Sequence, residues 1–420
     1  MQFAEAVQYL LSLGHETLTI KLGLRNTELL LHTLRNPERS FKSVQIAGTN
    51  GKGSTAVMLD AICRAAGIKT GLYTSPHLVS ITERIRIGGV EITQKDFARH
   101  TTIVRSVAHE LLGSKQIDAL PTFFEQLTVI ALNAFREAGV ELAILETGLG
   151  GRLDSTTAAN AAVVGITQIA MDHEEYLGHT LASIAGEKAA IIRPGVTAVI
   201  GEQEPQALEV LLQRCAAVGV RPSLPEGRNV WKGDVPLNLR GAHQIQNASV
   251  AIRLAEGLRQ HGFAITSDQI GFGLATATHA GRLELIPPFL LDGAHNPAGA
   301  NALRTYLDEL DEEFLTLVFG AMRDKKLDQI AEILFPIADC LVLTTIQNPR
   351  SASVATLAPL AKMFTRGIVI ETDSSAGAVR TALTQTPAGG LICITGSLYL
   401  IGETRPMIQN LAEEKYDHAT

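Results

Sequence analysis

The chain has 420 residues, enough for two or three domains, and 46% of them are hydrophobic against 19% charged. The formal net charge of −7 gives no basic face for a nucleic-acid backbone. Four widely spaced cysteines without a CxxC pair suggest neither a zinc site nor a disulfide framework. No secretory signal or membrane-length apolar run is present. We therefore expect a cytoplasmic monomer without nucleic-acid or membrane partners.

The first part of the chain reads as an α/β domain. Apolar residues between Phe3 and Leu11 recur at helical spacing. An apolar run at 44–47 leads through a glycine-rich turn into a helical pattern at 56–63, which predicts strand, loop and helix. Further buried strands are predicted at 142–145, 162–167 and 196–200. Helical patterns between these runs indicate a P-loop-type, doubly wound, mostly parallel sheet.

The pattern restarts near residues 278–282, where we expect a domain boundary. The predicted domains are therefore a larger N-terminal domain, 1–280, and a smaller Rossmann-like α/β domain, 281–420. Strand-like runs in the second domain lie at 289–291, 315–319, 340–344, 367–370 and 391–394.

Residues 46–55, IAGTNGKGST, have the parts that hold a triphosphate. Glycines free backbone N–H groups, and a lysine and hydroxyls stand at a helix start. The segment departs from GxxxxGK[ST], because fewer residues separate the glycines and Gly53 follows Lys52. A turn without a ligand is the alternative, but the lysine and hydroxyls, with a strand before and a helix after, favour binding of a nucleotide's phosphates. The expected contacts are Gly48, Thr49, Asn50, Gly51, Lys52, Gly53 and Ser54.

AGTNGKGS resembles the phosphate loop of folylpolyglutamate synthases and cell-wall Mur ligases. The segments YTSPHL (73–78), TERIRIGG (82–89), LETGLGGRLDST (145–156) and Asp172-His173 narrow the resemblance. Together they resemble the bifunctional dihydrofolate synthase/folylpolyglutamate synthase family across essentially the whole chain. The resemblance implies an ATP- and Mg²⁺-dependent ligase that adds L-glutamate to dihydropteroate and to reduced folates through an acyl phosphate.

Glu146 is predicted to end a buried strand, where side chains of parallel sheets reach the ligand crevice. The resemblance implies that Ser75, Glu146 and His173 bind Mg²⁺, with Ser54 beside the phosphates. Imidazole is an unusual Mg²⁺ ligand. On the residues alone, a paired strand-end carboxylate, a turn serine before Pro76 and a surface histidine stay open.

Lys188 lies among apolar residues, and a buried lysine can have its pKa lowered enough to react with CO₂. The resemblance implies this modification, a carbamate that holds a second Mg²⁺. A helix lysine paired with an acid is the alternative. Asn247 is implied as a nucleotide contact, although an amide that packs a helix accounts for it equally well.

Arg282 and Asp292, near the start of the second domain, are also implied as nucleotide contacts. Arg282 would reach the γ-phosphate and join Lys52 in catalysis. His295, in the segment DGAHNP, would help to place the incoming glutamate. A salt bridge and a turn-stabilising role remain alternatives for Arg282 and His295.

For the dihydropteroate site, the resemblance implies two short segments and one loop. Phe123 and Phe124 offer an apolar face to a ring system, or are core residues of the helix after Pro121. The implied contacts are Leu24 and Arg25 of the LGLR segment, Thr122, Phe123, Phe124 and Glu125, and Gly151, Arg152 and Leu153.

Three alternatives to the bifunctional enzyme stay open. A Mur-type ligase would need a site for an amino-sugar nucleotide, and we see no signature of one. The sequence alone poorly distinguishes a monofunctional folylpolyglutamate synthase from the bifunctional enzyme. A non-catalytic ATP-binding switch would leave the joint presence of Lys52, Glu146, His173 and Lys188 hard to explain.

Overall fold

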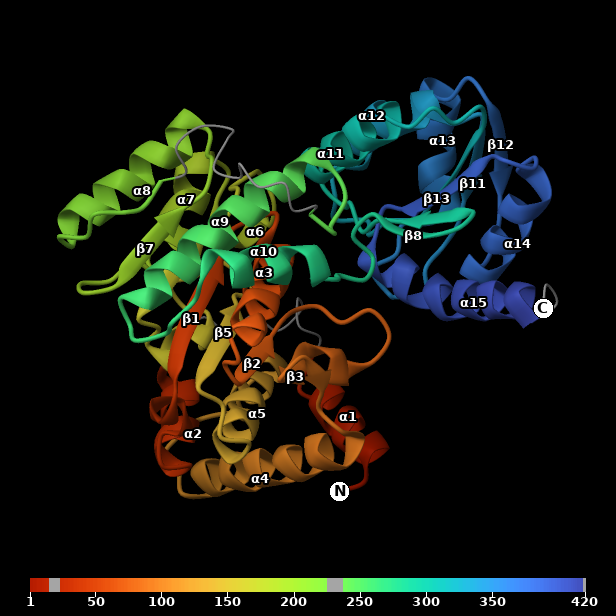
Figure 1. The fold of residues 1–420 in the computed structure, drawn as a ribbon. Helices are drawn as coiled ribbons and strands as arrows, with labels where there is room; N and C mark the ends of the chain where they lie inside the picture. The colour runs from red at the N-terminus through yellow and green to blue at the C-terminus, as the bar shows by residue number, and fades with distance from the viewer. Residues whose placement is uncertain (15–22, 225–236, 418–420) are drawn as a thin grey trace. The chain divides into compact units, whose positions relative to one another are not determined.

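The computed structural model describes residues 1–14, 23–224 and 237–417, with side chains up to residue 414 (Figure 1). It divides into two compact units. The first comprises Met1–Asn238 and Gln244–Thr278, and the second comprises Leu239–His243 and His279–Thr420. Each unit has its own sheet. In the described part of the chain, no helix is both long and apolar enough to cross a membrane.

The strands of the first unit are β1 Lys42–Ala47, β2 Thr70–Tyr73, β3 Ile85–Ile87, β4 Val90–Glu91, β5 Leu142–Glu146, β6 Val163–Ile166 and β7 Thr197–Ile200. Their order is β4-β3-β2-β5-β1-β6-β7. The strands β2, β5, β1, β6 and β7 run parallel, and β3 and β4 are antiparallel. The predicted doubly wound, mostly parallel sheet is confirmed.

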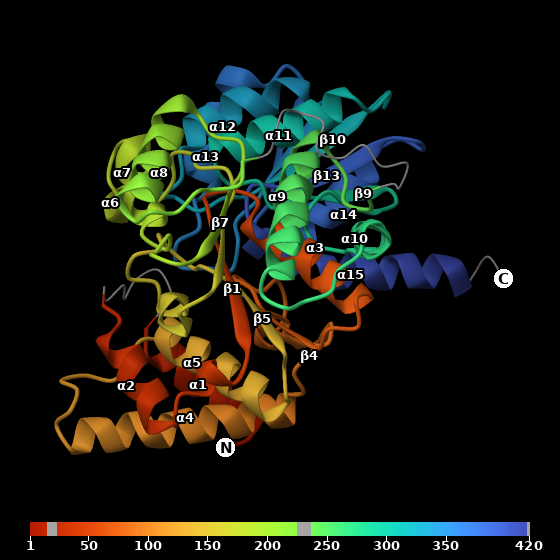
Figure 2. The same ribbon diagram turned by 60° about the vertical axis from the view of Figure 1, so that its left-hand side comes forward.

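The helices of the first unit are α1 Phe3–Ser12, α2 Arg25–Thr33, α3 Lys52–Ala65, α4 Gln94–Gly113, α5 Phe123–Glu137, α6 Glu174–Leu177, α7 Leu181–Ala189, α8 Pro205–Ala217, α9 Ala242–Arg259 and α10 Ser267–Thr276. Three short 3₁₀ helices are η1 Pro37–Ser40, η2 Ile81–Arg84 and η3 Ser155–Ala159. The helices α3, α9 and α10 cover one face of the sheet (Figures 1 and 2).

The opposite face is covered by α5 near β2 and β5 and by α7 and α8 near β6 and β7. Close packing needs glycine on both faces. A Cβ at Gly71 of β2 would lie 2.6 Å from the Phe135 ring of α5, and one at Gly165 of β6 would lie 3.0 Å from Leu254 of α9. The helices α1, α2 and α4 gather around α5 (Figure 2).

The strands of the second unit are β8 Glu284–Ile286, β9 Phe289–Leu291, β10 Leu315–Phe319, β11 Cys340–Leu343, β12 Ile368–Glu371 and β13 Leu391–Thr395. Its helices are α11 Pro297–Asp308, α12 Leu327–Leu334, α13 Val354–Phe364, α14 Ser375–Gln385 and α15 Leu398–Asp417, with a short 3₁₀ helix η5, Phe335–Ile337. The sheet order is β12-β11-β10-β13-β9-β8, with only β8 antiparallel among the described strands.

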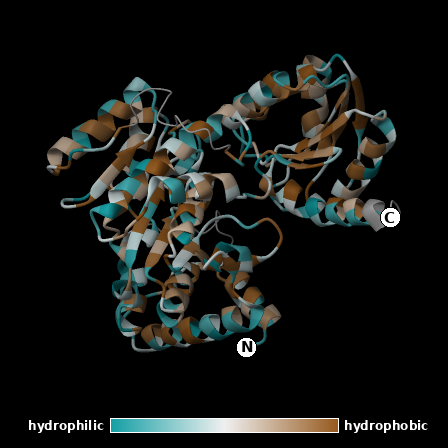
Figure 3. Ribbon diagram, in the orientation of Figure 1, coloured by the Kyte–Doolittle hydropathy of each residue, from teal (hydrophilic) through white to brown (hydrophobic). Residues whose placement is uncertain are grey.

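Figure 3 shows hydrophobic residues along the strands of both sheets, as expected for parallel strands buried on both faces, and residues of both kinds on the helices. The predicted second α/β domain is therefore confirmed as a fold. The positions of its five predicted strands agree with β9 to β13 to within one residue at each end. The edge strand β12 is mostly exposed.

Candidate active site

The phosphate loop connects β1 with α3 through two glycines that have positive φ. Gly51 is the N-cap of α3, with φ 84°, and Gly48 has φ 155°. A Cβ at Gly51 would collide with Oδ1 of Asn247, and one at Gly48 would collide with Oγ1 of Thr167. Glycine is therefore required at both positions by conformation and by space.

The segment after β6 holds this loop from one side. The backbone N–H groups of Thr49 and Asn50 donate to the carbonyl oxygen of Gln168 at 2.8 and 3.1 Å. The Thr49 hydroxyl donates to the carbonyl oxygen of Ala170 at 3.0 Å and accepts from its N–H at 3.1 Å. Two N–H groups of the loop are thus used to fix its shape, and the same segment continues to His173.

Gln203, just after β7, is a functional candidate that the sequence did not reveal. Its side chain accepts from the N–H of Ile169 at 2.9 Å and donates to the carbonyl oxygen of Thr167 at 2.8 Å. It therefore clamps the segment on which Thr49 and Asn50 rest. A lone glutamine after a strand carries no motif, so only the fold exposes this role.

Two lysines reach the phosphate loop. Lys52 Nζ donates to the carbonyl oxygen of Thr49 at 3.0 Å, and Lys188 Nζ, from α7, donates to that of Gly48 at 2.7 Å. The Lys188 residue is 4% exposed. Burial, and next the charge of Lys52, lower the pKa of Lys188 to about 7, against the opposing effect of Asp172. A substantial fraction of this amine is therefore neutral at physiological pH.

Helix α9 supplies amide side chains on the other side of the loop. Asn247 Nδ2 donates to Oε1 of Gln244 at 2.9 Å, and Gln244 Nε2 donates to Oγ of Ser54 at 3.3 Å. The Thr55 hydroxyl donates to the carbonyl oxygen of Asn247 at 3.4 Å. The structure thus brings the predicted Asn247 to the start of α3 and adds Gln244, which was not among the predicted contacts.

Glu146 and Ser75 lie at the carboxyl ends of neighbouring strands. Ala143 and Leu145 pack in the cluster with α5, so Glu146 faces the α3 side of β5 by strand alternation. The N–H of Ser75 donates to Oε2 of Glu146 at 3.0 Å. These two predicted metal ligands are therefore adjacent.

His173 is the N-cap of α6 and has a left-handed backbone with φ 50°. Its Nε2 lies 3.9 Å from Oδ2 of Asp172. Within residues 1–14, 23–224 and 237–417, there is no group of three or more His, Cys, Asp or Glu side chains that could hold a metal ion. Mg²⁺ is usually held by one or two carboxylates together with substrate phosphates, so the adjacent Ser75 and Glu146 fit it, and the imidazole of His173 is the unusual member of the predicted set.

Residues 122–125, one of the two predicted dihydropteroate segments, also have structural roles in α5. Thr122 is the N-cap and forms a capping box, in which its N–H donates to Oε2 of Glu125 at 2.7 Å. Phe123 is 3% exposed and belongs to the hydrophobic core. The Arg84 guanidinium lies 5.4 Å from the centroid of the Phe123 ring. Packing and capping account for these three predicted contacts.

Phe124 is half-buried and lies beside the loop that follows β5. Its ring centroid is 5.8 Å from that of Tyr73, and a Cβ at Gly148 would lie 2.6 Å from the ring. On α2, Leu24 is the half-buried N-cap residue and Arg25 is exposed. Leu22 of the LGLR segment lies outside the described residues.

The loop 148–154 is held by a buried carboxylate. Asp154 Oδ2 accepts from the N–H groups of Gly148 and Leu149 at 2.8 and 3.0 Å. Burial raises the pKa of Asp154, and these hydrogen bonds oppose that shift. Of the predicted contacts, Gly151 is buried and Leu153 is half-buried.

Arg152, the remaining predicted contact of this loop, is exposed and pairs with Glu187 of α7 at 3.0 Å. This ion pair links the loop to the helix that carries Lys188. The sequence had offered no partner for Arg152.

In the second unit, the predicted residues gather around Gly293. The Asp292 carboxylate accepts from the N–H groups of Leu283 and Ala294 at 2.9 and 3.0 Å, and burial raises its pKa. His295 Nδ1 is 2.8 Å from the carbonyl oxygen of Gly293. A Cβ at Gly293 would lie 3.2 Å from Nη1 of Arg282. The fold therefore brings Arg282, Asp292 and His295 to one loop.

Comparison with known proteins agrees with this geometry. Residues 46–217 match the Mur ligase middle domain, and residues 281–398 match the Mur ligase glutamate ligase domain. The chain is 37% identical to the dihydrofolate synthase/folylpolyglutamate synthase of Mycobacterium tuberculosis over 84% of this chain and 80% of that protein.

Two solved structures extend the likeness. Mycobacterium tuberculosis folylpolyglutamate synthase complexed with ADP and AMPPCP superposes with a TM-score of 0.87 at 33% identity, covering 97% of this chain and 99% of that one. Escherichia coli FolC in complex with DHPP and ADP gives 0.86 at 28% identity, covering 98% of each chain. The chain therefore belongs to the dihydrofolate synthase/folylpolyglutamate synthase family of Mur ligases.

Proposed function

We propose that this protein is an ATP-dependent ligase that adds L-glutamate to dihydropteroate, forming dihydrofolate, and to reduced folates, forming polyglutamates. The observation that carries the proposal is the convergence of Lys52, Lys188 and Asn247 on a phosphate loop, in a chain of this family. ATP and a divalent cation are the cofactors. Relatives solved with ADP and AMPPCP support the nucleotide.

The reaction has two steps. A carboxylate oxygen of the acceptor attacks the γ-phosphorus of ATP, which gives an acyl phosphate and releases ADP. The amine of glutamate, after losing a proton, then attacks the acyl carbon, so that the amide forms and inorganic phosphate leaves. Residues 48–54 orient the triphosphate, and Lys52 and Arg282 stabilise the charge on the transferred phosphoryl group.

Ser75, Glu146 and His173, with Ser54, would hold Mg²⁺. When bound, this ion would neutralise part of the negative charge of the phosphates. The neutral amine of Lys188 attacks CO₂, forming an N–C bond and releasing a proton, and the resulting carbamate would hold a second Mg²⁺. A pKa of about 7 for Lys188 supports this modification.

For the acceptor, the proposed contacts are Leu24 and Arg25, residues 122–125 and residues 151–153. Phe124 is the best supported of these, because its ring is half-buried beside Gly148. In the second unit, Asp292 contacts the nucleotide and His295 places the incoming glutamate. We assign ATP binding to a domain of residues 1–280 and glutamate ligation to a domain of residues 281–420.

We also propose that the protein acts in the cytoplasm as a monomer. All four cysteines are unpaired and buried, which suits a reducing compartment. Light scattering of the purified chain tests the monomer, and a mass of twice 44.9 kDa would refute it.

The test is glutamate- and Mg²⁺-dependent release of ADP by the purified protein, with dihydropteroate and reduced folates as separate acceptors. Turnover with both is expected. Lys52→Met should lower kcat by about 100-fold or more, as loss of a charge-stabilising group does. Lys69→Met, which removes an exposed lysine just before β2, is the control and should leave kcat unchanged.

Each other outcome selects an alternative. Turnover with folates alone would identify a monofunctional folylpolyglutamate synthase. Absence of turnover with every acceptor, with ATP still bound, would favour a non-catalytic ATP-binding switch.

A further inference from the structure

Two loops stand together at the carboxyl edge of the second sheet. Residues 320–326 follow β10 and residues 345–352 follow β11. Met322 and Ser351 form an isolated antiparallel bridge, with backbone hydrogen bonds of 2.9 and 2.8 Å on either side of it. We call these residues the paired loops. Because the backbone joins them, they form one surface at the edge where parallel α/β sheets bind ligands.

The paired loops are strongly basic. They carry the four cations Arg323, Lys325, Lys326 and Arg350 against one acid, Asp324, in a chain with a formal net charge of −7. Asp324 is engaged by Arg350 at 2.7 Å. Glu403 of α15 also lies against the second loop, where it accepts from the N–H of Gln347 at 2.7 Å. The two loops themselves still have more cations than acids, in contrast to the chain as a whole.

Arg323 is the exposed member of this set. Its Nη2 donates to the carbonyl oxygen of Pro349, and no carboxylate in the described part of the chain lies within ion-pair distance of its guanidinium. One nitrogen of the guanidinium is thus held by this hydrogen bond, and the rest of the fork-shaped group is exposed to solvent. Arginine recognises carboxylates through such a fork.

A buried hydroxyl at the same edge also lacks a partner. Thr395, at the end of β13, is fully buried, and its Oγ1 makes no hydrogen bond. The carbonyl of Thr395 accepts from the N–H of Gly320 at 3.3 Å, so this residue adjoins the first of the paired loops. An unsatisfied buried polar group in a native fold calls for an explanation, and a ligand at this edge would provide one.

We propose that the paired loops bind the carboxylates of the glutamate tail of polyglutamylated folates, which deepens the proposed function and rests on it. Each glutamate in the tail leaves one carboxylate outside the amide chain, so the tail is a row of negative charges. The phosphates of ATP already have their own loop at residues 48–54. A single incoming glutamate has two carboxylates and one ammonium group, a net charge of −1, so this basic surface attracts it less strongly than a tail that has one free carboxylate for each glutamate and a second at its end.

The test compares acceptors with and without a tail, using the full-length protein. The variants are Arg323→Gln and the double variant Arg323→Gln/Lys325→Gln. Arg380→Gln, which removes an exposed arginine from α14 of the same unit, is the control. The acceptors are dihydropteroate, which has no glutamate, and tetrahydrofolate with one and with three glutamates.

We expect the double variant to raise KM for the triglutamate by about threefold to tenfold, the effect of losing two partly exposed charge contacts. KM for dihydropteroate should stay within about twofold of the wild-type value, because that acceptor has no tail. Arg323→Lys should recover part of the loss. For the wild type, KM for the triglutamate should also rise more steeply with salt than KM for dihydropteroate.

Two outcomes would overturn the proposal. An unchanged KM for the triglutamate would remove any role of the paired loops in tail binding. A raised KM for L-glutamate with dihydropteroate as acceptor, without dependence on tail length, would assign the loops to the incoming amino acid. Failure of the wild type to use any acceptor would instead refute the proposed function itself.

Discussion

At the scale of single residues, Lys188 makes a testable contribution to stability. Its pKa is about 7 in the folded protein, against 10.5 for an ordinary lysine. Between these values the unfolded chain binds more protons than the folded one, so stability rises with pH through this window. Below pH 7 both states are protonated and the cost of burying the charge is present in full. The wild type should therefore gain stability from pH 6.5 to 8.5 relative to Lys188→Met.

Urea unfolding at several pH values measures this difference. Lys188→Met keeps a similar volume without a charge, so other titrating groups cancel in the comparison. Parallel stability profiles for the two proteins would show that Lys188 is not neutral in the fold. Lys69→Met serves again as the exposed control and should follow the wild type.

Individual residues also show how far sequence reasoning extends. The glycines, Lys52 and Glu146 could be predicted because strand, loop and helix follow one another locally. Gln203 could not, because its role depends on the backbone of residues 167–169, which only the tertiary fold brings to it. The capping box of Thr122 and Glu125 has a sequence signature, yet the resemblance drew attention to these residues as substrate contacts.

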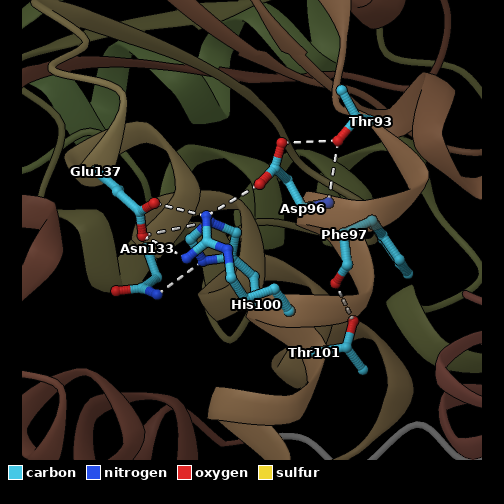
Figure 4. A network of polar contacts seen from close by, with 8 residues as sticks. Thr93, Asp96, Phe97, His100, Thr101, Asn133 and Glu137 are labelled. Carbon is cyan, nitrogen blue, oxygen red and sulfur yellow. Dashed lines mark hydrogen bonds and ion pairs between the residues drawn. The ribbon is translucent and has the colours of Figure 1, made fainter. Parts of the chain in front are cut away.

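At the scale of elements, α4 and α5 are joined by a polar network (Figure 4). Arg99 Nη2 lies 2.6 Å from Oε1 of Glu137 and 3.2 Å from Oδ1 of Asp96. The Nε2 atom of His100 lies 3.1 Å from Arg99 Nη2, and its Nδ1 is 2.9 Å from Nδ2 of Asn133. Burial, and next the charge of Arg99, lower the pKa of His100 below 6.5.

Acid should therefore weaken the contact between these two helices. The unfolded chain takes up a proton on His100 near pH 6.5 while the folded chain resists it, so stability falls as the pH drops below 6.5. The wild type should lose more stability from pH 7 to 5.5 than His100→Gln, whose side chain stays neutral. Hydrogen exchange of α4 and α5 locates the effect. Equal losses in the two proteins would contradict this account.

The prediction of elements succeeded for strands that lie in mostly apolar runs, including the three residues of β9, and failed for short strands interrupted by glycine or polar residues. The strand β2, Thr70–Tyr73, contains a glycine and only four residues, and its membership of the sheet depends on its neighbour β5. The hairpin of β3 and β4 is likewise short and partly exposed. Hydrophobic periodicity does not reveal β2 or this hairpin, because pairing with other strands stabilises them.

For the whole molecule, nucleotide binding should stabilise the folded state. A ligand at about 100 times its Kd that binds only the folded protein adds about 2.7 kcal/mol to the free energy of unfolding. AMPPCP with Mg²⁺ should produce this shift in the wild type and not in Lys52→Met at the same concentration. Hydrogen exchange should show added protection in residues 46–66 and 167–173. Protection confined to the second unit would place the nucleotide elsewhere.

The packing of Asn247 against Gly51 affects when, during translation, the phosphate loop can take its final form. The loop at residues 48–54 leaves the ribosome early, whereas Lys188 and α9 are translated much later. Domains begin to fold during synthesis, from the N-terminus onward. A nascent chain that ends before α9 lacks the Asn247 side chain that packs against Gly51, so we expect the loop to reach its final form only after most of the first unit has been translated.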